Sequence, residues 1–259
     1  SDWVINNVYS YSQYGEVTVS SERLFIPTQL FAPDSEQADA LAAANARDML
    51  IIDDNADGSG NSQYLLGAGG IDPYNPIRLG DKVSQVVGVM DYGFSNYRVR
   101  PLGLVDVVKE NARTDEPELV EGNLTLASFN VLNLFNGNGQ GEGFPTSRGA
   151  DTVAEYERQL EKIVSAMLEL NADAIGLMEI ENNGFGDESA IATLVNALNA
   201  DATSQGMTDV TWAYSITRDG NGTEVSPGDD AIAVGVIYNS QAVTPVGDAA
   251  TKADGAFTS

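Results

Sequence analysis

The fold of this chain is decided by three consecutive segments: LTLASFN (124–130), DTVAEYERQLEKIVSAMLEL (151–170) and DAIGLMEI (173–180). The first segment has the composition and alternation of a strand. The second repeats apolar side chains at the three- and four-residue spacing of an amphipathic helix. The third is a mostly apolar run of strand length, as expected of a buried strand. A strand, a helix and a strand in this order predict a layered α/β domain.

The same alternation continues toward the C-terminus, with a helical pattern at 188–199 and strand patterns at 210–216 and 231–238. Residues before about 110 read differently. Short β-branched and aromatic runs alternate there with Gly, Pro, Asn and Asp, which is typical of a small β-barrel or sandwich. These runs are 4–9, 16–19, 24–26, 49–52, 83–90 and 97–104, with one helical stretch at 35–47 and a hairpin turn at 91–94.

We therefore predict an α+β protein of two domains. Residues 1–112 form a β-rich accessory domain that is expected to resemble an oligonucleotide-binding (OB) barrel. Residues 113–122, which are acidic and contain Pro117, form a linker. Residues 123–259 form the α/β domain, and their pattern ends without an evident final element, so we expect them to be part of a longer domain.

The charge and the amino-acid composition exclude several classes of binding and catalytic site. The 259 residues contain 38 Asp and Glu against 13 Lys and Arg, which gives a formal charge of −25. This balance argues against a nucleic-acid binder with a basic surface, and is typical of proteins in saline habitats or of surfaces that attract divalent cations. Histidine and cysteine are absent. These residues therefore contain no Ser-His-Asp triad, no zinc–histidine or thiolate site and no imidazole base. No apolar run is long enough for a membrane span.

Two polar residues stand at the ends of predicted strands. Glu179 follows the apolar run AIGLM, and Asn130 closes LTLASFN. An ionised carboxylate among apolar neighbours is costly unless a cation meets it, and strand ends are where ligand sites form in α/β domains. Glu179 is therefore a candidate metal ligand, with loop capping or pairing with Arg as alternatives. Asn130 is a candidate for binding a phosphate oxygen or a metal-bound water, with turn formation as the alternative.

Residues 124–184 resemble bacterial secreted nucleases of the endonuclease/exonuclease/phosphatase (deoxyribonuclease-I-like) superfamily. The motifs SFNVLN (128–133) and IGLMEIEN (175–182) resemble the first two active-site motifs of that family, and GDDAIAVGVIYN (228–239) resembles a later strand. Upstream, the resemblance extends to a β-rich segment that precedes the catalytic domain, through RLFIPTQL (23–30), IIDDNADGSG (51–60), IDPYNPIRLGDKV (71–83) and GVMDYGFSNYRVRP (88–101).

The resemblance implies a two-sheet α/β sandwich that hydrolyses phosphodiesters of extracellular DNA, or of RNA, with Mg²⁺ or Mn²⁺. By it, Glu179 is a metal ligand and Asn130 positions the metal or the phosphate. Asp230 is carried over more weakly, as a residue near the cleft. Apart from the resemblance, Arg148 near the base of the glycine-rich stretch 136–149 is a weak candidate for contact with a phosphate. The resemblance also implies a secreted bacterial protein with no membrane partner.

The family's catalytic histidines have no counterpart in these residues. We therefore expect the chain to hold the N-terminal half of the catalytic domain, to lack its C-terminal half and to be inactive alone. Two alternatives stay open: a phosphomonoesterase of the same superfamily, and a noncatalytic binding or assembly module on the same scaffold. Ca²⁺ is a further candidate ion, because Asp53, Asn55, Asp57 and Gly58 match the opening of a calcium loop, although Tyr64 stands where its glutamate belongs.

Overall fold

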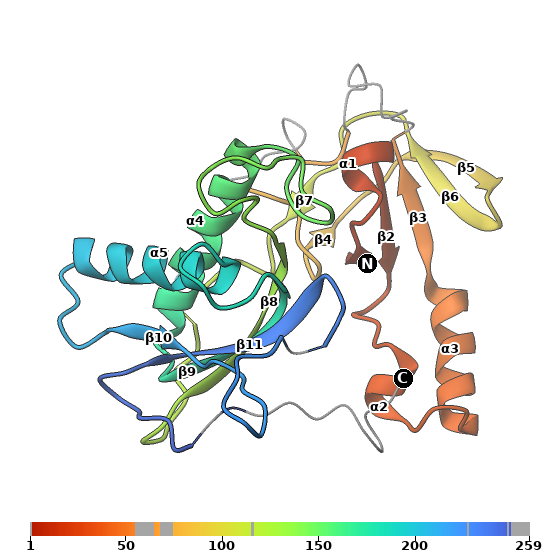
Figure 1. Cartoon of the computed structure of the whole chain (residues 1–259). Helices are drawn as coiled ribbons and strands as arrows, with labels where there is room; N and C mark the ends of the chain where they lie inside the picture. Colours follow the sequence, from red (N-terminus) through yellow and green to blue (C-terminus); the bar gives the residue numbers. More distant parts are fainter. Residues whose placement is uncertain are drawn as a thin grey trace. The chain divides into compact units, whose positions relative to one another are not determined.

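A computed structural model describes residues 2–54, 65–67, 75–114, 117–226, 228–247 and 249. The chain divides into two compact units, Ser1–Thr114 and Asp115–Ser259, each with its own hydrophobic core. Each unit contains one β-sheet accompanied by helices (Figure 1). The molecule is thus a mixed α+β protein with two sheets, and the predicted class is confirmed at that level.

Unit 1 is built on a seven-stranded sheet with the order β5-β6-β3-β2-β1-β4-β7. Neighbouring strands are antiparallel except β3 and β6, which are parallel. The alternation of β-branched residues explains the packing, because Val17 and Val19 of β2 both point into the core. The strands are β1 (Trp3–Asn7), β2 (Glu16–Ser20), β3 (Leu50–Asp53), β4 (Lys82–Val83), β5 (Gly88–Gly93), β6 (Asn96–Pro101) and β7 (Val107–Val108).

Three helices accompany this sheet: α1 (Tyr11–Tyr14), α2 (Pro27–Leu30) and α3 (Glu36–Asp48). The predicted helix at 35–47 is α3, and it begins at Ser35, whose side chain accepts a hydrogen bond from the Ala38 amide. The predicted hairpin is β5–β6. Its turn residues Phe94 and Ser95 both have positive φ, as a two-residue turn between twisted strands requires.

Two predicted strands of unit 1 are wrong. Residues 24–26 are not a strand, because Pro27 opens α2 directly behind them and the Leu24 amide donates to the Asn6 side chain instead of a ladder. The run 83–90 is not continuous either. It divides into the end of β4 and the start of β5, which lie far apart in the sheet order.

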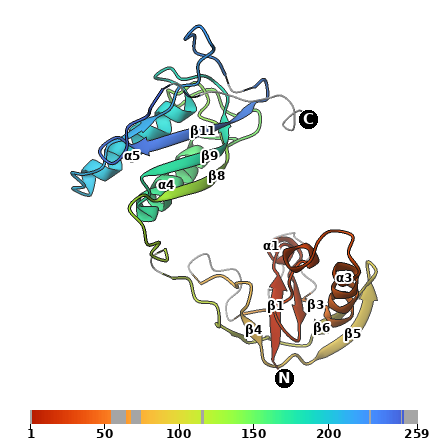
Figure 2. The same cartoon turned by 90° about the horizontal axis from the view of Figure 1, so that it is seen from below.

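Unit 2 contains a four-stranded sheet with the order β10-β11-β9-β8. Figure 2 shows β11, β9 and β8 side by side. The strands are β8 (Leu126–Leu134), β9 (Ala174–Glu181), β10 (Trp212–Tyr214) and β11 (Ile232–Asn239). Strands β8 and β9 are parallel, and β11 runs antiparallel to both of its neighbours. The helix α4 (Val153–Leu170) makes the crossover between the parallel pair, as the periodicity of residues 151–170 predicts.

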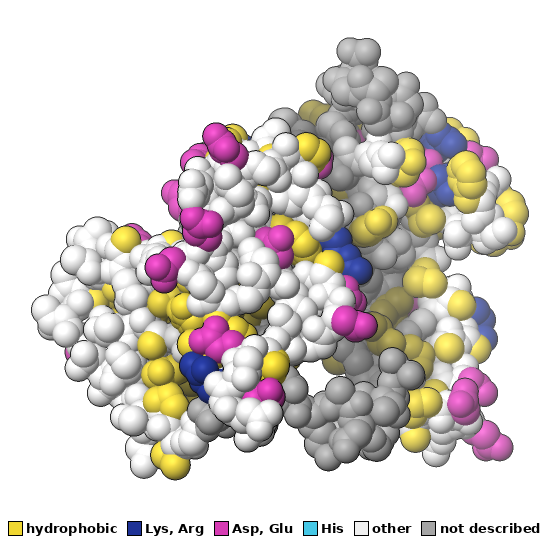
Figure 3. All heavy atoms as spheres, in the orientation of Figure 1, with side chains coloured by type: hydrophobic (Ala, Val, Ile, Leu, Met, Phe, Trp, Pro, Cys, Tyr) yellow, Lys and Arg dark blue, Asp and Glu magenta, His cyan; other side chains and the backbone are white. Residues whose placement is uncertain are grey.

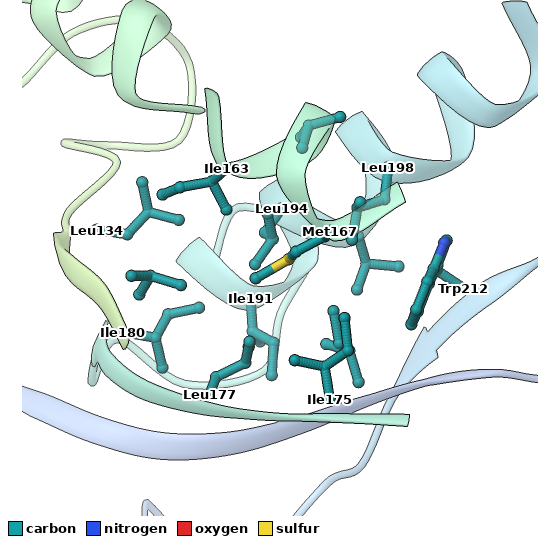
Figure 4. Packing of buried hydrophobic residues seen from close by; sticks show 14 of the residues in the cluster. Leu134, Ile163, Met167, Ile175, Leu177, Ile180, Ile191, Leu194, Leu198 and Trp212 are labelled. Atoms are coloured by element: carbon teal, nitrogen blue, oxygen red, sulfur yellow. The ribbon is translucent and has the colours of Figure 1, made fainter. Parts of the chain in front are cut away.

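One face of this sheet is covered by α4 and by α5 (Ala190–Ser204). Both helices begin at side-chain caps, in which Thr152 and Ser189 accept from the third amide that follows. The core lies between the helices and the sheet (Figure 4). It includes Leu134, Ile163, Met167, Ile175, Leu177, Ile180, Ile191, Leu194, Leu198 and Trp212.

The opposite face of the same sheet is apolar and open. Leu126 of β8 and Val234 and Val236 of β11 alternate with the core residues of their strands, and they are 69%, 65% and 45% exposed. A sheet that buries only one face normally carries polar side chains on the other. Alongside the polar Ser128 and Asn130 of β8, this face therefore carries more aliphatic surface than is usual for a face open to water.

Replacing Leu194 by Ala should lower the free energy of unfolding of unit 2 by about 2–5 kcal/mol, because the side chain is fully buried and its loss leaves a cavity. Unfolding in urea can be followed by the fluorescence of Trp212, with Trp3 replaced by Phe so that only unit 2 reports. Leu119→Ala is the control, since Leu119 is 98% exposed and its loss should change the free energy by less than about 0.5 kcal/mol. Equal effects of the two changes would contradict the described core.

Candidate functional site

The parallel strands β8 and β9 are both irregular at the edge where they end. Their pairing holds from Leu126 to Asn130 and then shifts, so that the next pair is Leu134 with Ile180. Leu132, Asn133 and Glu179 all have positive φ, which L-residues other than glycine rarely adopt. Such residues cost of order 1–3 kcal/mol each and cluster at functional sites. Two neighbouring strands therefore carry strained bulges at the same place.

The bulge in β9 decides where Glu179 points. Ile175 and Leu177 are buried, so strict alternation would put Glu179 on the core side as the next residue but one. Instead Ile180 takes the buried position and is 2% exposed, while Glu179 is half-buried. The bulge thus moves the glutamate off the core face. The sequence expectation of a carboxylate enclosed by apolar neighbours is corrected here to a half-buried one.

Asn130 and Glu179 are in direct contact. The Asn130 Nδ2 donates to Glu179 Oε1 at 2.8 Å, and Asn130 Oδ1 accepts from the Leu132 amide at 2.8 Å. The asparagine is therefore held by the bulge of β8 and in turn orients the carboxylate. Within the described ranges no Lys or Arg lies within 4.0 Å of Glu179, and its Oε2 has no hydrogen bond. Of the alternatives for Glu179, pairing with Arg does not occur in that part of the chain.

The bulge of β8 is held from the helix layer. Gln159 of α4 donates through Nε2 to the carbonyls of Val131 at 2.8 Å and of Leu132 at 2.7 Å. These carbonyls lie where the strand pairing is interrupted, so they depend on a side chain for a donor. Sequence reasoning missed Gln159, because its place in an amphipathic helix gives no sign of what it contacts.

Asp230 and Arg148 meet each other at the same end of the sheet. Arg148 Nη2 lies 3.0 Å from Asp230 Oδ1, and both side chains are about half exposed. Asp230 lies two residues before β11, which begins where β9 ends, and its carbonyl accepts from Asn182 Nδ2 at 2.9 Å. The structure therefore places all four candidate residues at one edge of the sheet, as two pairs.

A second carboxylate, Glu181, was not singled out from the sequence. Its Oε2 accepts from the Asn136 amide at 3.0 Å and from Asn183 Nδ2 at 3.2 Å. Burial raises the pKa of Glu181, and the hydrogen bond from the Asn136 amide partly opposes this. Burial, followed by the charge of Glu181, raises the pKa of Tyr156 to about 12. The alternation of two glutamates at 179 and 181 was the available signal.

Asn136 ties this carboxylate to α5. It is 1% exposed, and its Nδ2 donates to the Glu188 carbonyl at 2.8 Å and to Thr193 Oγ1 at 2.9 Å. Beside it lies an open polar cavity of about 490 Å³. The cavity is lined by Gly137, Asn138, Asn183, Gly186, Asp187, Glu188 and Ser189.

Glu179 offers a hard cation one carboxylate as a ligand. Among the described residues no three acidic side chains form a group able to hold a metal. Mg²⁺ is commonly bound by one or two carboxylates, with waters and substrate oxygens completing its shell, so one oriented carboxylate fits that ion. The candidate calcium loop has no described side chain that is shown to be available for a metal. Asp53 binds Arg98 Nη1 at 2.7 Å, and Asn55, Asp57, Gly58 and Tyr64 lie outside the described residues.

Comparison with known proteins gives one match. Residues 5–110, which make up most of unit 1, match the model of a domain of unknown function, DUF8508. No curated protein and no solved structure matches the chain. Among the described residues, no helix has the length and apolar character that crossing a membrane requires.

Replacing Gln159 by Leu should destabilise unit 2 by about 1–3 kcal/mol, because two carbonyls at the bulge lose their donor. Urea unfolding of unit 2 measures the change. Arg158→Leu is the matched control, since it alters an exposed neighbour on the same helix. If both variants unfold at the same urea concentration, the bulge does not depend on Gln159.

Glu181→Gln should change how stability depends on pH. The pKa of Glu181 is raised in the folded state, so its contribution to stability is complete below the unfolded pKa and is lost as pH rises through the folded pKa. The glutamine keeps an acceptor for Asn136 and Asn183 but has no charge to bury. The variant should therefore gain stability relative to the parent as pH rises from about 4 toward neutrality.

Urea unfolding of unit 2 at several pH values measures this difference. Glu157→Gln, on the exposed side of α4, should leave the pH profile parallel to that of the parent. Parallel profiles for Glu181→Gln as well would show that its carboxylate is not perturbed by burial.

Proposed function

We propose that the natural protein is a secreted, divalent-metal-dependent nuclease that hydrolyses phosphodiesters of extracellular DNA, and that unit 2 is part of its catalytic domain. The observation that carries the proposal is the strained pair of bulges that brings Asn130 and Glu179 together. Strained backbone of this kind is destabilising and clusters at sites where side chains are held in a fixed relation. The proposal also rests on the resemblance of residues 124–184 to that nuclease family.

The proposed chemistry depends on which polar atoms of Asn130 and Glu179 are already hydrogen-bonded and which are available for a ligand. Asn130 uses its Nδ2 on Glu179 and its Oδ1 on the backbone, so it orients the carboxylate. Glu179 keeps Oε2 available for Mg²⁺ or Mn²⁺. A bound divalent ion would supply positive charge to the scissile phosphate and lower the pKa of an attacking water. These residues contain no histidine, so they supply no imidazole base.

The finer fold is part of the same proposal. The open apolar face of the unit 2 sheet, with Leu126, Val234 and Val236, is what a second sheet would cover in a two-sheet sandwich. We propose that a second sheet of the same catalytic domain covers that face. The OB-like character of unit 1 stays a prediction, since its sheet has seven strands in one row rather than the five of an OB barrel.

Electrostatics make the metal ion necessary in this proposal. The formal charge of −25 repels DNA, and acidic side chains are spread over the face of the molecule drawn in Figure 3. Arg148 is the nearest candidate for a phosphate contact, but it is paired with Asp230. It would reach a phosphate only by exchanging that partner, so it adds little net positive charge at the site.

Glu179→Gln in the natural full-length protein should reduce the rate of plasmid DNA cleavage by at least about 100-fold, because the metal loses its charged ligand. Conversion of supercoiled to open-circular plasmid measures the rate in millimolar Mg²⁺, and EDTA should abolish it. Glu157→Gln, which removes an exposed charge elsewhere in unit 2, should leave the rate within about twofold.

Unchanged cleavage by Glu179→Gln, or full activity in EDTA, would remove the metal role of Glu179. Faster hydrolysis of small phosphate monoesters than of plasmid DNA would replace the nuclease by a phosphomonoesterase. Absence of both activities from the full-length protein would favour the binding module.

A further inference from the structure

Unit 1 contains a cavity of about 830 Å³ beside β1 and β4. Its walls are of two kinds. Val4, Val8, Ile77 and Leu79 supply aliphatic surface, and Arg23, Arg78 and Lys82 supply positive charge. Gly80, Glu110 and Asn111 complete the lining. A volume of this size suits a small organic molecule better than a bare ion.

The positive charge of this cavity is unusual for the chain. Acidic residues outnumber basic ones by 38 to 13 overall, yet the described residues that line the cavity include three cations and one carboxylate. Two positive charges are therefore in excess at this place. Scarce cations gathered in one hollow create a local potential opposite in sign to that of the whole protein.

The cations are also poorly partnered within the described residues. Lys82 Nζ lies 3.7 Å from Glu110 Oε1, which is a loose pair, and Arg23 donates a weak hydrogen bond of 3.5 Å to Asn6 Oδ1. Arg78 forms no ion pair there, and its Nε is buried without a hydrogen-bond partner. Buried donors are nearly always satisfied in native proteins, so Arg78 Nε is an exception in unit 1, as Arg98 Nε also is.

The cavity wall is held in place by a buried carboxylate. Asp81 is fully buried and accepts from the Arg78 amide at 2.9 Å and from the Glu110 and Asn111 amides at 3.2 Å. Lys109 Nζ lies 3.5 Å from the same carboxylate. These contacts fix the segments that carry Arg78, Glu110 and Asn111 relative to each other. Hydrogen bonds within the fold of unit 1 therefore hold this part of the cavity wall in place.

We propose that this cavity binds a small phosphate monoester dianion whose organic part is aliphatic. Two excess positive charges match a dianion and would be only half neutralised by a carboxylate. Guanidinium groups bind phosphate oxygens through paired N–H donors, and Arg78 forms no ion pair with the described residues that would compete for them. Among the described residues the walls are aliphatic and no aromatic side chain lines the cavity, which favours an alkyl body over a nucleobase.

Isothermal titration calorimetry of the 259-residue chain with n-hexyl phosphate, inorganic phosphate and hexanoate tests the proposal. EDTA is present throughout, so that no metal-bridged phosphate at Glu179 contributes. Hexyl phosphate should bind at least about tenfold more tightly than inorganic phosphate, because of the aliphatic walls, and more tightly than hexanoate, because of the charge match. Arg78→Gln and Arg23→Gln should each weaken its binding about tenfold or more.

Arg47→Gln is the matched control, since Arg47 is an exposed arginine of the same unit in the last turn of α3 and does not line the cavity. It should change the affinity for hexyl phosphate by less than about twofold, and so should Glu179→Gln. Circular dichroism checks folding, and if Arg78→Gln is unfolded, the exposed Arg23 carries the test. Hexanoate binding as tightly as hexyl phosphate, no saturable binding up to about 10 mM, or unchanged affinity in the arginine variants would each overturn the proposal.

Discussion

The arrangement of unit 2 depends on one backbone constraint, the pair of bulges at the ends of β8 and β9. Without the left-handed residue in β9, period-two alternation would send Glu179 into the helix-covered core and leave a charge among leucines and isoleucines. With it, Ile180 fills the core and the carboxylate emerges beside Asn130. The left-handed conformation of Glu179 therefore determines both the packing of Ile180 in the core and the position of the candidate site.

The two units differ in how a buried or half-buried charge is compensated. In unit 1, Arg98 is 2% exposed and is matched by Glu16 at 2.6 Å and Asp53 at 2.7 Å, so its charge is neutralised within the fold. The carboxylate of Glu179 has only an amide beside it in the described part of unit 2. A matched charge is structural, whereas an oriented and unmatched one remains available for a ligand. In contrast to Arg98, Arg78 on the cavity wall forms no ion pair with the described residues.

Sequence periodicity predicted the regular elements of unit 2 well, because α4, β9 and β11 bury one face over many residues and so repeat a clear pattern. It predicted unit 1 less well. Strands as short as β4 and β7 have two residues each, and pairing with distant neighbours defines them rather than local composition. For the site, strand ends led to Asn130 and Glu179, but bulges are tertiary features. Gln159, Asn136 and Glu181 therefore came only from the structure.

The bulge in β8 has a second consequence, because β8 is the outermost strand of its sheet. A long, straight border strand with exposed leucines would offer its free amides and carbonyls to another molecule and invite open-ended fibril growth. Leu132, which is 72% exposed, lies in the left-handed stretch that interrupts this border. The bulge that positions Asn130 and Glu179 thus also shortens the regular part of the edge strand, with which a strand of another molecule could pair.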